Sequence, residues 1–315
     1  MTVSIIIPCY RQAHFLPEAI ESGLAQKHAA EIIVVDDGSP DATREIAARY
    51  PTVRYIRQEN KGLAEARNVG FGLSRAEYVI FLDADDRLTP NAVEAHLRCF
   101  AENPQAGFVV GDIDHIAQDG SVVAESPRWP LLREKFYEEL LRVNHVANTI
   151  AVMFRREVIE RVGGFDRTCC PAEDYRLLLA AARLYPSAHH RTVVAQYRRH
   201  ATSLSRRGVI MLRAMDRVME LEKEHVRDRP GLEAARQEGV RYWRDHFGRV
   251  GLHEFAARLT QGDLAGALST FGGLIRYGRG QLLLLPWRYW RRILRMLRLR
   301  FGLPGTPNTG GTKKL

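Results

Sequence analysis

Short apolar runs alternate with amphipathic stretches through the N-terminal part of the chain. Short runs rich in β-branched and aromatic residues predict strands at residues 3–7, 32–35, 53–57 and 78–82, of which the last is expected to be fully buried. Three helices are expected between these strands. The first spans residues 15–27, the second ends at Tyr50, and the third spans residues 62–73. The alternation predicts an α/β fold with a doubly wound, mostly parallel sheet flanked by helices.

Turn and cap residues set the expected ends of these elements. Pro8 is expected to stop the first strand, and Pro17 stands where a proline fits the first turn of a helix. Ser39 or Asp41 would cap the second helix.

The remainder of the chain has a different pattern. Residues 208–257 are expected to be helical, with Met211, Met215, Val218 and Met219 spaced to fill one buried face. The aromatic side chains expected to pack this helical appendage onto the N-terminal domain are Trp243, Phe247 and Phe255.

Residues 281–303 predict an amphipathic helix. After Pro286, one face carries Trp287, Trp290, Ile293, Leu294, Leu297 and Phe301, and the other carries Arg288, Arg291, Arg292, Arg295 and Arg298. No window has the roughly 18–20 uninterrupted apolar residues of a spanning helix. The pattern favours a helix lying on an anionic membrane surface, and the alternative is docking on the protein itself or on a dimer partner.

The charge distribution agrees with this division. The net charge is +9, yet ten of the 46 basic residues follow Asp263, the last acidic residue, and the other 36 face 37 acidic residues. The basicity therefore belongs to the C-terminal segment. No nucleic-acid-binding module accompanies it, so we expect no nucleic acid partner.

The four cysteines lack the paired spacing of a zinc site, and the neighbours Cys169 and Cys170 are expected to be incidental. Reduced thiols fit a cytoplasmic location. A signal peptide needs a basic region followed by a long apolar region. The first residues instead have the pattern of a strand, so no signal peptide is expected.

Three carboxylates follow the most apolar strand, at Asp83, Asp85 and Asp86. The carboxyl ends of strands are where open α/β sheets bind ligands, and Mg²⁺ or Mn²⁺ would compensate such a cluster. The alternative is a solvated acidic turn. The dinucleotide fingerprint G-x-G-x-x-G is absent after the first strand, which argues against a nicotinamide or flavin enzyme.

A series of motifs in order resembles the family-2 glycosyltransferases with the GT-A fold. The motifs are Ser4–Tyr10, Val34–Ser39, Asn60–Asn68, Phe81–Asp86, Val162–Asp166, Glu173-Asp174 and Tyr197–His200. The resemblance covers roughly the first 205 residues, so it implies a catalytic domain at 1–205. A helical appendage at 206–274, the basic amphipathic segment at 275–303 and a disordered tail at 304–315 would follow.

The resemblance implies a nucleotide-sugar donor. Its site would contain Pro8, Tyr10, Asp36, Asp37, Arg67 and Asp83. Tyr10 would stack on the base, Asp37 would accept a hydrogen bond from a ring N–H, and Arg67 would lie near the base or phosphates. In the D-x-D element, Asp85 would bind Mg²⁺ or Mn²⁺, and Asp83 would contact the ribose or a metal-bound water. His200 would complete the metal site. Without the resemblance, Asp36 and Asp37 would be an ordinary turn.

The resemblance also implies a catalytic base at Asp174, with Glu173 as the second candidate. Both residues would also suit the first turn of a helix at 175–184, where acidic side chains are favourable. A single displacement at the sugar would invert its anomeric configuration. The run Gln196–His200 has histidine where processive members carry tryptophan, which favours the transfer of one sugar.

The sequence thus predicts a metal-dependent, inverting glycosyltransferase, peripheral on the cytoplasmic face of the membrane. Its acceptor would be lipid-linked or a surface polysaccharide. A catalytically silent, membrane-tethered scaffold that binds nucleotide sugars is the alternative, and the intact Asp83, Asp85, Asp174 and His200 count against it. A nucleotidyltransferase would need a glycine-rich basic loop after the first strand, and Pro8–Gln12 is not one.

Overall fold

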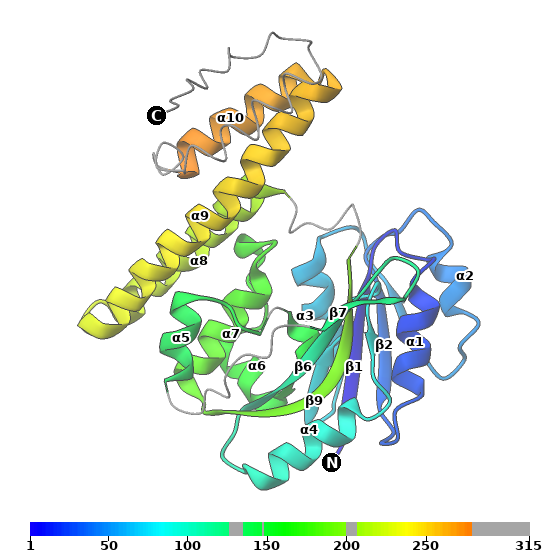
Figure 1. Ribbon diagram of the computed structural model, residues 1–315. Coiled ribbons are helices and arrows are strands. Elements are labelled where there is room, and N and C mark those ends of the chain that lie inside the picture. Colours follow the sequence, from blue (N-terminus) through cyan, green and yellow to red (C-terminus); the bar gives the residue numbers. More distant parts are fainter. Residues whose placement is uncertain (126–134, 147, 200–206, 279–315) are drawn as a thin grey trace, which may run out of the picture. The chain divides into compact units, whose positions relative to one another are not determined.

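The computed structural model describes residues 1–125, 135–146, 148–199 and 207–278 (Figure 1). Within these ranges a nine-stranded sheet has the order β3-β2-β1-β4-β8-β6-β9-β5, with β7 paired to β6. The strands are β1 Val3–Cys9, β2 Glu31–Asp36, β3 Arg54–Arg57, β4 Tyr78–Phe81, β5 Arg87–Leu88, β6 Phe108–Ile116, β7 Val122–Glu125, β8 Val152–Arg155 and β9 Ser187–Arg198.

Helices connect and flank these strands. They are α1 Leu16–Leu24, α2 Thr43–Ala47, α3 Leu63–Leu73, α4 Ala92–Glu102, α5 Phe136–Arg142, α6 Arg156–Val162, α7 Glu173–Leu184, α8 Gly208–Val226, α9 Pro230–Gln261 and α10 Leu264–Gly278, with 3-10 turns η1 Thr149–Ala151 and η2 Arg167–Cys169. The expected α/β alternation is confirmed. The second helix ends at Ala47, before the expected Tyr50, since Tyr50 precedes Pro51 and such residues disfavour the helical conformation. Ala42 occupies the cap position, and the carboxylate of the expected cap residue Asp41 accepts from the backbone N–H of Thr43 at 3.3 Å.

Pro8 does not end the first strand, because β1 continues to Cys9. The pairing of β1 with β4 ends where Leu82 N donates to the Ile6 carbonyl. Backbone polar groups of alternate residues point to the same side of a strand, so the nitrogen of Pro8, like the carbonyl of Ile6, points toward β4. Its missing N–H therefore lies where the sheet has no partner strand to bond.

The N-terminal half of the sheet is parallel, and the second half mixes directions. β1 runs parallel to β2 and β4, and β2 runs parallel to β3. β8 enters antiparallel between β4 and β6, whereas β6 and β9 are parallel. The carboxyl ends of β1, β2 and β4 consequently meet at one edge of the sheet.

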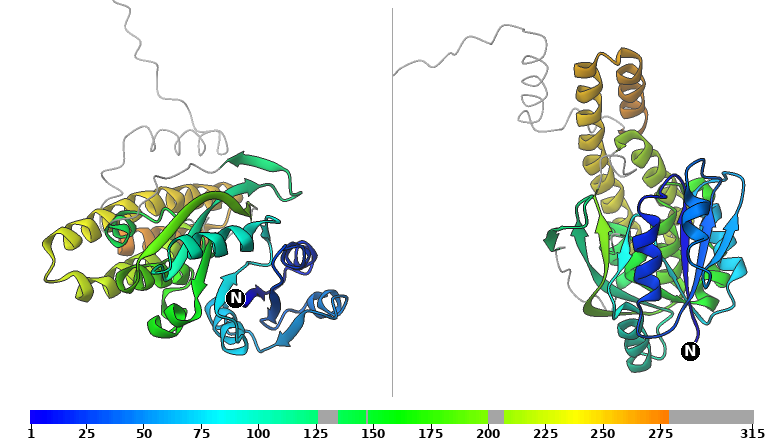
Figure 2. Two further views of the ribbon diagram at one scale, coloured as in Figure 1. Left: turned by 90° about the horizontal axis from the view of Figure 1, so that it is seen from below. Right: turned by 90° about the vertical axis from the view of Figure 1, so that its right-hand side faces the viewer.

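Helices cover both faces of the sheet (Figures 1 and 2). Ile5 of β1 is in register with Ile32 of β2, and a Cβ at Gly23 of α1 would lie 2.8 Å from the Ile32 Cδ1 atom. The neighbouring positions Ile6 and Val35 face the other way, where Gly70 of α3 contacts both. The two glycines thus let α1 and α3 approach opposite faces closely.

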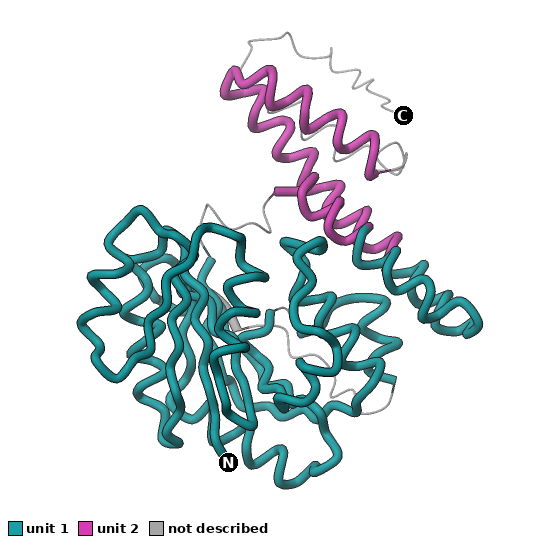
Figure 3. The backbone as a smooth tube through the Cα atoms, turned by 180° about the vertical axis from the view of Figure 1, so that it is seen from behind, with its two compact units in different colours: residues 1–203, 217–239 teal, residues 204–216, 240–315 magenta. Residues whose placement is uncertain are grey.

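The chain divides into two compact units (Figure 3). Unit 1 comprises residues 1–203 and 217–239, and unit 2 comprises residues 204–216 and 240–315. The expected appendage is helical, and its apolar side chains Met211, Met215, Val218, Met219, Trp243 and Phe247 are buried. The expected segments at 281–303 and 304–315 lie outside the described residues. Among the helices that the structure describes, none is both long enough and apolar enough to cross a bilayer.

Candidate active site

The predicted donor residues follow three neighbouring parallel strands. Tyr10 follows β1, Asp37 follows β2, and the acidic turn, residues 83–86, follows β4 after one further residue. Cys9 of β1 is in register with Asp36 of β2, which brings the first two groups side by side. This edge is the usual ligand-binding edge of an open α/β sheet.

Asp36 is buried and shapes the backbone at this edge. One carboxylate oxygen accepts from the Ser39 backbone N–H at 2.7 Å, and the other accepts from the Tyr55 hydroxyl at 2.6 Å. Burial, and then the hydrogen bond to Asp36, raise the pKa of Tyr55 to about 12. Asp36 therefore holds the turn after β2 rather than facing solvent.

Asp37 fixes the loop that leads into α3. Its carboxylate accepts from the Gln58 side chain at 2.7 Å and from the backbone N–H groups of Lys61 and Gly62, each at 2.8 Å. Gly62 has a φ of +90°, a conformation that favours glycine. The structure thus gives Asp37 a local role in positioning the loop that carries the Asn60–Asn68 motif.

Pro8 is buried, whereas the side chain of Tyr10 is 41% exposed at the same edge. The guanidinium of Arg11 lies 5.3 Å from the Tyr10 ring centre. An exposed aromatic ring beside the strand ends is suited to stacking on a planar ligand.

Arg67 joins two motifs that are far apart in the sequence. Its side chain is 2% exposed, and it donates to Asp83 at 2.6 Å and to Glu173 at 2.7 Å. Its guanidinium also lies 5.2 Å from the ring centre of Phe165. Burial alone would lower the pKa of Arg67, but the two carboxylates outweigh burial and raise it. A permanently charged arginine therefore links the acidic turn to the start of α7.

Asp83 is only partly accessible, with 20% of its side chain exposed. One oxygen is held by Arg67, and the other lies 3.3 Å from the side-chain nitrogen of Asn148. Asn148 was not singled out by the sequence, because no periodicity or motif marks it as a site residue, whereas Phe165 belongs to the Val162–Asp166 motif.

Glu173 and Asp174 begin α7 but lie in different environments. Glu173 is 2% exposed and bound to Arg67, whereas Asp174 is partly exposed and accepts from the Tyr175 backbone N–H at 2.7 Å. Burial, followed by the negative charge of Glu173, raises the pKa of Asp174 to about 7. A carboxylate with a pKa near neutrality has the property that a general base needs.

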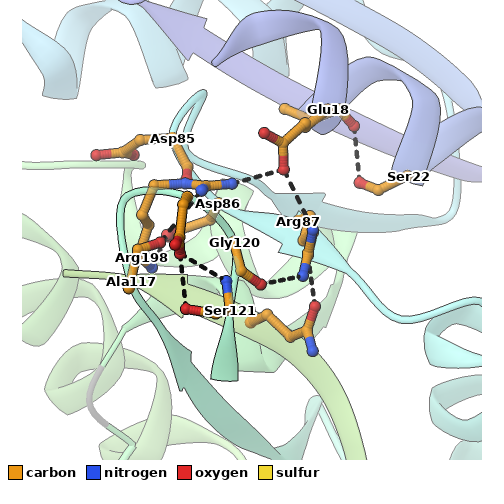
Figure 4. Close-up of polar contacts among 12 residues, drawn as sticks. Glu18, Ser22, Asp85, Asp86, Arg87, Ala117, Gly120, Ser121 and Arg198 are labelled. Carbon is orange, nitrogen blue, oxygen red and sulfur yellow. Dashed lines mark hydrogen bonds and ion pairs between the residues drawn. The ribbon is translucent and has the colours of Figure 1, made fainter. Parts of the chain in front are cut away.

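Arg198 anchors the acidic turn (Figure 4). Its backbone N–H donates to the Asp86 carboxylate and its Nε donates to the Asp85 carbonyl, both at 2.7 Å. Its side chain is fully buried and also donates to the Gln118 carbonyl at 2.8 Å and to the Glu18 carboxylate at 2.7 Å. The turn is thereby fixed to the end of β9, to α1 and to the turn after β6.

Asp86 and Asp85 point to different surroundings. Asp86 is 1% exposed, and its burial, followed by the charges of Asp85 and Asp83, raises its pKa well above the usual value. Asp85 is partly exposed. The turn therefore hides Asp86 beside Arg198 and leaves Asp85 closer to solvent.

The donor set of the acidic turn consists of oxygen atoms, which Mg²⁺ and Mn²⁺ prefer. In the described ranges, however, no three histidine, cysteine, aspartate or glutamate side chains are grouped so that they could hold a metal ion. His200, the third expected ligand, lies outside the described residues. Asp83 and Asp85 would thus supply only part of a coordination sphere.

Comparison with known proteins identifies the type of domain. A family model described as "Glycosyl transferase family 2" matches residues 4–163, about half of the 315-residue chain. The matched range includes the strand ends after β1, β2 and β4, and it stops before Asp174.

Two curated relatives act in polysaccharide synthesis by name. Chondroitin synthase of Escherichia coli is 31% identical over 192 residues, covering 59% of this chain and 27% of that protein. The succinoglycan biosynthesis protein ExoO of Rhizobium meliloti is 33% identical over 192 residues, covering 57% of this chain and 55% of that protein. The chain thus spans about half or less of the length of these two relatives.

A solved structure shares the fold over most of the chain. S. aureus TarS 1–349 in complex with UDP-GlcNAc superposes with a TM-score of 0.54 at 16% identity. The similarity covers 96% of this chain and 92% of that one. At this identity it supports the GT-A-like arrangement of the domain and nothing finer.

Proposed function

The chain belongs to glycosyl transferase family 2, and on that basis we propose that it transfers one sugar from a nucleotide-sugar donor with inversion at the anomeric carbon. Its acceptor would be a lipid-linked saccharide or a surface polysaccharide. The reaction would require Mg²⁺ or Mn²⁺. Residues 281–303 would hold the protein on the cytoplasmic face of an anionic membrane.

The observation that carries this proposal is the buried bridge made by Arg67. It binds Asp83 of the acidic turn and Glu173 of α7 at 2.6 and 2.7 Å, although Asp83 and Glu173 belong to separate motifs. A glycosyl transfer needs the departing diphosphate and the acceptor base on either side of one sugar. The bridge holds the acidic turn and the first turn of α7 close together, and this supports the proposal.

The donor would bind along the strand ends. Tyr10 would stack on the base, and Asp37 would accept from a ring N–H while it keeps the loop at Lys61 and Gly62 in place. A nucleotide-sugar donor is supported by TarS, a protein with this fold that was solved in complex with UDP-GlcNAc.

A bound cation would neutralise the negative charge that grows on the leaving diphosphate. Asp85 would be its main protein ligand, because this carboxylate is partly exposed and Arg198 fixes its backbone. Asp83 would orient the ribose or a metal-bound water, and His200 would add a ligand. Diphosphate oxygens would have to supply the remaining coordination.

Asp174 would remove the proton from the acceptor hydroxyl. Its partial exposure and its pKa of about 7 suit this task, whereas Glu173 is buried and committed to Arg67. Glu173 would therefore act as the residue that positions Arg67. Transfer of a single sugar is supported by the sequence, since Gln196–His200 lacks the tryptophan of processive members.

The decisive experiment measures donor binding and donor turnover separately. The purified chain would be titrated with a panel of nucleotide sugars, with Mg²⁺, Mn²⁺ or a chelator, beside Asp85→Ala, Asp174→Asn and the control Asp228→Asn at an exposed turn. We expect metal-dependent binding that is lost in Asp85→Ala. Asp174→Asn should bind donor but turn over little, and the control should match the unsubstituted chain.

Two results would contradict the proposal in different ways. Tight donor binding without hydrolysis or transfer to any lipid extract would identify a nucleotide-sugar-binding scaffold. No binding to any donor would remove the transferase proposal altogether.

A further inference from the structure

Helix α10 exposes an apolar face in unit 2. Four large side chains lie at intervals of four, three and four residues, so they share one side of the helix. Their exposed fractions are 63% for Leu264, 71% for Leu268, 41% for Phe271 and 58% for Ile275. We call these four residues the outer face of α10.

The opposite side of α10 is already buried. Ala267, Thr270 and Leu274 are covered, and a Cβ on Gly251 of α9 would lie 2.6 Å from the Leu274 Cδ2 atom. A Cβ on Gly273 would lie closer still to the Val209 Cγ1 atom. Because this inner side is closely packed, α10 cannot rotate to hide its outer face, and the helix is apolar on two sides. Helices that are hydrophobic all round are normally covered by another apolar phase.

We propose that the outer face of α10 docks on an anionic lipid surface. The one charged residue of α10, Arg276, is exposed beside Ile275. From Leu264 to the end, the sequence has ten basic residues and no acidic residue. Basic residues next to exposed apolar side chains are suited to a surface of negatively charged headgroups.

Charge also argues against a second copy of this chain as the occupant. Each copy would carry ten basic residues and no acidic residue from Leu264 onward, and like charges oppose the association of two such chains. An anionic bilayer would instead attract each chain. The inference rests on the membrane attachment proposed above, and it extends that attachment from residues 281–303 to a helix of unit 2.

The test is binding of the full chain to phosphatidylcholine vesicles with and without phosphatidylglycerol. The double variant Leu268→Ser/Ile275→Ser removes two outer-face side chains, and Leu24→Ser/Leu184→Ser is its control at exposed positions of unit 1. We expect the outer-face variant to bind anionic vesicles with an affinity at least about tenfold lower, because less apolar area enters the interface. The control should bind like the unsubstituted chain.

Each outcome decides the inference. Equal vesicle binding by the outer-face variant and the unsubstituted chain would overturn the inference. It would also be overturned if light scattering showed that the unsubstituted chain is a dimer and the outer-face variant a monomer. Absence of all vesicle binding would overturn the membrane attachment as well, whereas donor binding tests the transferase independently. If the first variant does not give the unfolding transition of the unsubstituted chain, Leu264→Ser/Leu268→Ser replaces it.

Discussion

The activity of the proposed site should follow the ionisation of Asp174. Its pKa is about 7, whereas an isolated aspartate has a pKa of about 3.9. The raised value means that Asp174 becomes protonated, and unable to act as a base, as the pH falls below neutrality. The kcat/KM at pH 6 should therefore be about one tenth of its plateau value, and at pH 5 about one hundredth.

The causes of the shift predict how a neighbour changes the profile. Burial raises the pKa of Asp174 most, the charge of Glu173 raises it further, and Arg67 lowers it. Glu173→Gln removes the negative neighbour and releases Arg67 from one partner. Both effects lower the pKa of Asp174, so the acid limb of the rate profile should move to lower pH. Asp174→Asn should reduce kcat by about 10²–10⁴-fold with little change in donor affinity.

The assay is donor turnover between pH 5 and 9 at constant ionic strength, with Glu157→Gln on the exposed side of α6 as the matched control. The control should keep the acid limb of the unsubstituted chain. A rate that stays constant from neutrality to pH 5.5 would refute the assignment of the base. An acid limb that persists unchanged in Asp174→Asn would assign it to a different group.

Three predictions concern stability, and they rest on two buried charges and on a histidine that burial keeps neutral. Arg198→Met removes a fully buried guanidinium that donates to the Asp85 and Gln118 carbonyls and to the Glu18 carboxylate. The unfolding free energy should fall by about 2–4 kcal/mol in urea, and a loss under about 1 kcal/mol would contradict this prediction. Glu222→Gln should lower the free energy of unfolding by about 3 kcal/mol, because Arg176 and Arg183 both pair with this fully buried carboxylate. An unchanged midpoint in urea would contradict this prediction. Burial lowers the pKa of His190 to about 4, below the unfolded value of about 6.5. The free energy of unfolding should therefore fall by about 1.4 kcal/mol per pH unit between pH 6.5 and pH 4. In thermal melts, His190→Gln should lose less stability over this pH range than the unsubstituted chain.

Local patterns predicted the first half of the fold well. The β-branched runs at β1, β2 and β4 are fully or almost fully buried, as continuous apolar strands in a parallel sheet should be. Because the α/β alternation predicts parallel strands, whose carboxyl ends meet at one edge of a sheet, the edge that carries Tyr10, Asp37 and the acidic turn could be placed from the sequence.

The second half of the sheet and the anchoring residues depend on contacts between distant segments. In the pairing of β6 with β9, Val109 lies opposite Ala188, about 80 residues further along the chain. No local pattern specifies a pairing between such distant segments. The same holds for Arg67 and Glu173, which are 106 positions apart. Arg198 lies in a motif recognised from the sequence, yet its bonds to Glu18 and to the Asp85 carbonyl required the folded chain.

The distribution of charge at this edge separates the carboxylates that hold the site from those that face solvent. Arg67 binds Asp83 and Glu173, and the backbone N–H of Arg198 binds Asp86. Asp86 and Glu173 are buried, whereas Asp83, Asp85 and Asp174 are partly exposed, and Arg67 already binds Asp83. A buried carboxylate held by an arginine cannot move to meet a ligand without losing that interaction. In the proposed reaction, Asp85 would therefore act on the diphosphate side and Asp174 on the acceptor side, while the two arginines hold the backbone and side chains around them.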